Sequence, residues 1–119
     1  MTRDPRAAMP EDRGPDSLDA HVRRLMADLG LFGYHTRNSK GSAAGWPDWV
    51  IIGRGGILYR ELKAEHGSLS PEQRHVGELI RQAGGNCRVW RPRDLLAGSI
   101  GRELADLAAI QLELFVAAP

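Results

Sequence analysis

The fold is decided by the stretch from Asp48 to Lys63, which reads DWVIIGRGGILYRELK. β-Branched and aromatic residues, which favour strands, fill both halves of this stretch, and a glycine-rich segment separates the halves. Such a pattern predicts a β-hairpin with its turn centred between Arg54 and Gly55. In that register Asp48 lies directly opposite Glu61 on the neighbouring strand.

The predicted hairpin brings two carboxylates and one ammonium group together. Directly opposed side chains have Cβ atoms about 5 Å apart, so Asp48 and Glu61 repel each other unless a cation offsets their charge. Side chains alternate along a strand, so Lys63 shares the face of Glu61. Carboxylates bind Mg²⁺, a bound metal activates water, and an ammonium group stabilises a developing oxyanion, which together suit phosphodiester hydrolysis. A plainer interpretation is a capped strand beside a solvated charge pair.

Helices and two further strands surround the hairpin in the sequence. Asp16 or Ser17 can cap a helix whose apolar residues recur with helical spacing up to Gly30. Ser70-Pro71-Glu72-Gln73 has the pattern of a capping box and opens a second helix that ends near residue 83. Short strands are predicted at 31–36 and 87–91, and a final helix begins near residue 92. The element order α-β-β-β-α-β-α indicates an α/β domain.

Length and composition indicate one soluble globular domain. The chain has 119 residues, 42% hydrophobic and 26% charged, which excludes a disordered or collagen-like protein. Its 16 Lys and Arg residues balance 15 Asp and Glu residues, which excludes a histone-like wrapping of DNA. No apolar stretch is long enough to span a membrane and no secretory signal is visible, so we expect a cytoplasmic protein. We expect a flexible tail at 1–15, the functional domain at 16–98 and a C-terminal helix at 99–119.

Cysteine and histidine do not form a zinc motif in this sequence. Cys87 is the single cysteine, and the four histidines are too scattered for the ligand spacing of zinc sites. We therefore expect neither an internal disulfide nor a bound zinc ion.

The central motifs resemble those of a known nuclease superfamily. Gly45-Trp46-Pro47-Asp48, followed after twelve residues by Glu61-Leu62-Lys63, resembles the signature of the PD-(D/E)XK nucleases. Gly67, Ser70 and Gln73 resemble the VRR-NUC branch, and the likeness extends over residues 16–94. The resemblance implies a restriction-endonuclease-like core, α-β-β-β-α-β plus a C-terminal helix, in which a mixed sheet is flanked by helices.

The resemblance also implies roles for individual residues. Asp48 and Glu61 match the ligands of Mg²⁺ or Mn²⁺, together with the backbone carbonyl of Leu62. Lys63 matches the catalytic lysine. Gln73 matches a glutamine that faces the active site, although completing the capping box is an alternative role for it.

One position departs from the family pattern. Family members usually carry a glutamate on the first helix as a further active-site acid, and this chain has none there. Asp16 and Asp19 are the nearest acids, and helical spacing brings Asp19 closer to the core-facing side. Asp19 is therefore a candidate for the further acid, with helix capping as the alternative.

Basic and aromatic residues near the motifs are candidates for DNA contacts. The residues that flank the proposed site are Arg37, Asn38, Ser39, Lys40 and Arg54. A second basic group near the last predicted strand consists of Arg88, Arg91 and Arg93. Both groups have a plainer interpretation as solvated surface. Trp46 and Trp49 are candidates for stacking on bases, with core packing as the commoner role.

The family resemblance completes the predicted function. It implies a Mg²⁺-dependent DNA endonuclease of bacterial or phage type, which acts as a homodimer on branched DNA such as Holliday junctions and leaves 5′-phosphate ends. Apolar residues of the last helix are candidates for the dimer interface, namely Leu104, Leu107, Ile110, Leu114 and Phe115. The alternatives are a restriction-type or general nuclease and a DNA-binding module that has lost catalysis.

Overall fold

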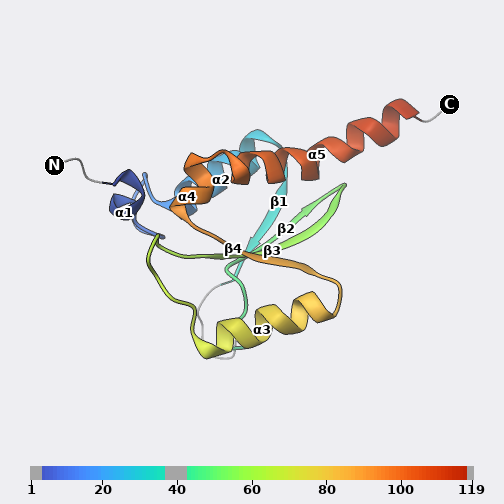
Figure 1. The fold of residues 1–119 in the computed structure, drawn as a ribbon. Helices are drawn as coiled ribbons and strands as arrows, with labels where there is room; N and C mark the ends of the chain where they lie inside the picture. Colours follow the sequence, from blue (N-terminus) through green and yellow to red (C-terminus); the bar gives the residue numbers. More distant parts are fainter. Residues whose placement is uncertain (1–3, 37–42, 118–119) are drawn as a thin grey trace.

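The predicted hairpin forms the centre of a four-stranded sheet with helices on both sides (Figure 1). The structure is a computed structural model that describes residues 4–36 and 43–117, with side chains described through residue 109. Its elements are α1 (Pro5–Ala8), α2 (Leu18–Asp28), β1 (Phe32–His35), β2 (Trp49–Gly53), β3 (Gly56–Leu62), α3 (Pro71–Gln82), β4 (Asn86–Trp90), α4 (Pro92–Leu96) and α5 (Ser99–Ala117).

The sheet is mixed, and its register is the predicted one. The strands lie in the order β1-β2-β3-β4; β2 is antiparallel to β1 and to β3, whereas β4 is parallel to β3. The hairpin pairs Trp49 with Arg60 and Gly53 with Gly56, which leaves a two-residue turn between the strands. Continued by one residue, this register sets Asp48 opposite Glu61.

The two predicted helix starts are confirmed. The Ser17 hydroxyl accepts a hydrogen bond from the Ala20 N–H (3.1 Å) at the start of α2. Ser70 and Gln73 form the full capping box of α3. The helix expected from residue 92 is instead two helices, because Gly98 between α4 and α5 has a φ of 81°, which ends the first of them.

The hydrophobic core lies between the sheet and the helices α2 and α5. Trp49 and Ile51 of β2 point into it, because alternate side chains of a strand share one face. The core-packing interpretation of Trp49 is therefore confirmed. The helix α3 lies on the other side of the sheet, where it packs against β4 (Figure 1).

The helix α5 contributes to this core, which corrects the predicted dimer interface. Leu104 is fully buried and Leu107 nearly so, both within the core of their own chain. They already cover the sheet, so they offer no surface to a second copy. The side chains of the other three predicted interface residues, Ile110, Leu114 and Phe115, lie outside the described residues. None of the described helices, α5 included, is long and apolar enough to cross a membrane.

Residues 4–15 are not the structureless tail that their composition predicts. They include the short helix α1, and Met9 packs against the core. The carbonyls of Pro10 and Glu11 accept hydrogen bonds from the N–H groups of Leu18 and Asp19, each at 2.9 Å. Those N–H groups belong to the first turn of α2, which has no helical partner for them. The segment is thereby tied to the start of α2, because its carbonyls satisfy these donors.

Candidate active site

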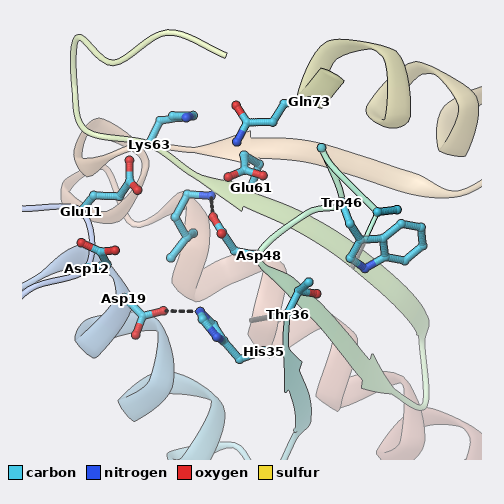
Figure 2. Close-up of a pocket in the computed structure, with 13 residues that line it drawn as sticks. Glu11, Asp12, Asp19, His35, Thr36, Trp46, Asp48, Glu61, Lys63 and Gln73 are labelled. Atoms are coloured by element: carbon cyan, nitrogen blue, oxygen red, sulfur yellow. Dashed lines mark hydrogen bonds and ion pairs between the residues drawn. The ribbon is translucent and has the colours of Figure 1, made fainter. Parts of the chain in front are cut away.

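A cleft of about 490 Å³ opens at the end of the sheet where β2 begins and β3 ends (Figure 2). Strand ends, the N-terminal segment and the start of α3 all contribute to its walls. The residues that line it are Glu11, Asp12, Asp19, His35, Thr36, Ala43, Gly45, Trp46, Asp48, Glu61, Leu62, Lys63 and Gln73. Four of the predicted catalytic residues, Asp48, Glu61, Lys63 and Gln73, are therefore brought together in one cleft.

Asp48 is held in place by the backbone of both neighbouring strands. Its Oδ2 accepts a hydrogen bond from the Leu62 N–H (2.8 Å), and its carbonyl accepts one from the Thr36 N–H (2.8 Å). The first contact ties the carboxylate to the end of β3, next to Glu61. The predicted opposition of Asp48 and Glu61 therefore extends to their side chains, which lie close enough to share a proton.

The electrostatics of this pair favour a proton or a cation. Glu61 is buried, with 7% of its surface exposed. Burial raises the pKa of Glu61 from 4.5 to about 9, and the hydrogen bond and negative charge of Asp48 act in the same direction, whereas Lys63 opposes them. A buried carboxyl beside a second carboxylate is the environment in which a bound divalent cation replaces the proton.

Gln73 has both of the roles considered for it. Its side-chain oxygen accepts a hydrogen bond from the Ser70 N–H (2.9 Å), which completes the capping box of α3. Figure 2 shows the Gln73 amide above Glu61, across the cleft from Asp48. The helix cap therefore fixes the position from which the amide faces the carboxylates.

Asp19 lines the cleft, but protein donors hold both of its oxygens. Oδ1 accepts from the Trp49 Nε1–H (2.9 Å), and Oδ2 accepts from the Arg23 Nε–H (2.6 Å). The His35 Nε2 lies 3.7 Å from Oδ1, and the Arg23 guanidinium lies over the Trp49 ring. These contacts join α2 to β1 and β2. Asp16, the other acid considered, is exposed and lies outside the cleft lining.

Glu11 and Asp12 are cleft residues that the sequence did not reveal. Glu11 Oε1 accepts a hydrogen bond from the Ala64 N–H (3.2 Å), and Figure 2 shows its carboxylate beside Lys63. Burial raises the pKa of Glu11, and the nearby charge of Lys63 acts in the opposite direction. No motif or periodicity marks these residues, because the docking of their segment on α2 is what brings them here.

Of the residues predicted to flank the site and contact DNA, the structure describes only Arg54. Arg37 to Lys40 lie outside the described residues. Arg54 lies in the hairpin turn, at the opposite end of β2 from Asp48, so the expectation that it flanks the site is wrong. Nearness to the motif in sequence is not nearness in space, since β2 carries the chain away from the cleft.

The strand-end arginines organise the loop that follows Lys63. Arg91 donates to the carbonyls of Ala64 and Gly67, each at 2.7 Å. Arg93 pairs with the buried Glu65 (2.9 Å). The guanidinium groups of Arg91 and Arg93 therefore bind groups of the protein itself, although Arg93, like Arg88, is exposed.

Comparison with known proteins supports the same fold. No family model matches the chain, and no curated protein does. A solved structure described as a VRR_NUC domain is similar with a TM-score of 0.52 and 26% sequence identity, over 60% of this chain and 76% of that one. Both the mixed sheet and the order of the helices agree with this likeness. The chain therefore has the fold of a VRR-NUC domain, a nuclease-type domain.

Proposed function

We propose that the protein is a Mg²⁺- or Mn²⁺-dependent endonuclease that hydrolyses phosphodiester bonds of DNA. The observation that carries the proposal is the cleft in which Asp48 faces Glu61 with Lys63 and Gln73 beside them. The nuclease-type fold supports DNA as the substrate. No other group of described residues combines opposed carboxylates with a lysine in one cleft.

Asp48 and Glu61 are the residues that would hold the metal, together with the backbone carbonyl of Leu62. Oxygen ligands of this kind are those that Mg²⁺ and Mn²⁺ prefer. Among the described residues, no group of three or more His, Cys, Asp or Glu side chains is arranged as a metal site. The raised pKa of Glu61 supports the assignment of these carboxylates as metal ligands, because a positive charge between their oxygens would offset their repulsion. When bound, the metal would supply Lewis-acid activation of water and of the phosphate.

The remaining residues of the cleft would position and stabilise the reacting groups. The Leu62 N–H keeps Asp48 turned toward Glu61. The Lys63 ammonium group offers positive charge to the negative charge that develops on the phosphate oxygens. The Gln73 amide is a donor on the opposite wall, and the negative charge of Glu11 is near enough to attract the positive charge of Lys63. Hydrolysis that leaves 5′-phosphate ends is the outcome implied by the family resemblance.

Branched DNA and a homodimer are further parts of this proposal. Cutting both strands of a junction requires two sites, which a two-fold dimer supplies. Leu104 and Leu107 do not form that interface, because they are buried in the chain itself. Light scattering of the purified protein would give the mass, which for a dimer is twice that of one chain.

The proposal is tested by incubating the protein with linear duplex, single-stranded, flap and four-way-junction DNA, each with Mg²⁺ or with EDTA. We expect cleavage only with the metal, with the junction cut fastest, and loss of cleavage in Asp48→Asn. The matched control is Asp28→Asn, an exposed acid at the end of α2, which should cleave like the wild type. Binding without cleavage in any metal would instead indicate a DNA-binding module.

A further inference from the structure

One face of the sheet carries an exposed strip of apolar side chains beside the cleft. Phe32 and Tyr34 of β1 are 65% and 59% exposed, and Ile52 and Ile57 of the hairpin are 44% and 43% exposed. Half of the large exposed hydrophobic residues of the described chain lie in this strip. Contiguous exposed apolar surface of this kind is typical of binding sites.

The sheet register shows that the strip continues the catalytic face. Side chains that lie on one face form rows across β1, β2 and β3. The first row holds Thr36, Asp48 and Glu61; the second holds Tyr34, Val50 and Tyr59; the third holds Phe32, Ile52 and Ile57. Successive rows are two residues apart along each strand, which is about 6.7 Å. The exposed aromatic rings therefore lie one and two steps from the carboxylates.

We propose that this strip binds the unpaired nucleotides that flank the scissile phosphate, with successive bases stacked on Tyr34 and Phe32. The inference rests on the proposed nuclease function. An extended single strand advances by about one row per nucleotide, so a phosphate held at the first row brings the next two bases over the second and third rows. Aromatic rings accept any base, so the strip takes unpaired nucleotides, such as those released where paired strands part at a branch point, without selecting their sequence.

Trp46 borders the strip on the side of α3. The residue is 39% exposed, and its ring stands perpendicular to that of Tyr59, with the ring centres 6.0 Å apart. Figure 2 shows the ring on the loop that leads to Asp48, pointing away from the carboxylates. Gly45 fixes this loop, because a Cβ atom there would collide with the backbone of Glu72 at the start of α3. The loop that carries Trp46 is therefore packed directly against the start of α3.

The position of the strip favours DNA over a second copy of the chain. A protein seated on the second and third rows would also cover the approach to the first row, where Asp48 and Glu61 lie. A single nucleotide strand is narrow enough to follow the rows and still expose its phosphate to the carboxylates. DNA can therefore occupy the strip and still reach Asp48 and Glu61, whereas a protein partner on the strip would block access to them.

The test measures binding of a fluorescent oligothymidylate about 12 nucleotides long, by anisotropy in EDTA, against a strand of equal length that lacks bases. We expect Tyr34→Ser and Phe32→Ser each to raise the Kd for the thymidylate by about tenfold and to leave binding of the abasic strand unchanged. Tyr34→Phe and Phe32→Tyr keep the ring and should bind like the wild type. Leu96→Ser removes an equally exposed apolar side chain on α4 and serves as the control.

Three outcomes would overturn the inference: unchanged affinity in the serine variants, equal losses for the abasic strand, or a dimeric wild type that Tyr34→Ser turns into a monomer. Thermal unfolding of each variant separates loss of stacking from loss of the fold. A wild type that binds thymidylate through these rings but cleaves no DNA with Mg²⁺ would refute the nuclease function and leave the stacking surface intact.

Discussion

Replacing Glu61 by glutamine changes how the stability of the metal-free protein responds to pH. In the folded chain, burial and the adjacent Asp48 raise the pKa of Glu61 from 4.5 to about 9. The folded protein therefore keeps a proton on Glu61 at neutral pH, whereas the unfolded chain has lost it. Glutamine resembles the protonated acid in shape and can donate to Asp48, but it does not titrate.

The sign and size of the effect follow from this difference in bound protons. The contribution of the protonated Glu61 is complete below pH 4.5 and is lost as pH rises through the folded pKa of about 9. Between these limits the free energy of unfolding of the wild type falls, relative to Glu61→Gln, by about 1.4 kcal/mol per pH unit. From about pH 6 to about pH 8 the free energy of unfolding of the variant should therefore rise by about 2.7 kcal/mol relative to that of the wild type.

The assay is urea unfolding, followed by circular dichroism in EDTA at a series of pH values. Subtracting the wild type from the variant cancels the contributions to stability that both proteins share. Glu72→Gln removes an exposed acid in the first turn of α3 and serves as the matched control. A Glu61→Gln difference that does not change with pH, or a variant that is less stable at about pH 8, would refute the reasoning. Saturating Mg²⁺ should stabilise the wild type and reduce the difference in free energy of unfolding between the two proteins.

Other substitutions test the remaining assignments. Lys63→Ala should lower the cleavage rate at saturating Mg²⁺ by about 10²-fold with an unchanged metal requirement, and full recovery at higher metal would make the lysine structural. Asp19→Asn keeps the acceptor for the Trp49 indole, so it should lower cleavage far less than Asp48→Asn in the same assay. Leu107→Ala should lower the free energy of unfolding by about 2–5 kcal/mol without changing the mass in light scattering, since this side chain fills the core.

Local rules were sufficient to predict the centre of the fold. The two-residue turn at Arg54 and Gly55 determines which residues of the hairpin face each other, so the pairing of Asp48 with Glu61 followed from the sequence. The capping box at Ser70 likewise involves only residues within one turn of helix. Interactions between near neighbours in the chain can be predicted in this way.

Contacts between distant segments could not be predicted from these rules. Asp19 meets Trp49 across 30 residues, and this contact determines where its carboxylate points. The burial of Leu107 depends on how α5 lies across the sheet, which helical spacing alone does not reveal. The spacing correctly identified an apolar face of α5. That face is covered by the sheet of the same chain and not by a second copy.

The contact of Glu11 with the Ala64 N–H has a consequence for the order in which the cleft forms during folding. The hairpin brings Asp48 and Glu61 together by closing a loop of a few residues, which is fast and costs little entropy. The Glu11 contact spans 53 residues and requires the N-terminal segment to dock on α2 first. We therefore expect the two opposed carboxylates to form early and to attract cations before Glu11 arrives beside Lys63. The cleft would acquire its charge in an early step and its finished wall in a late one.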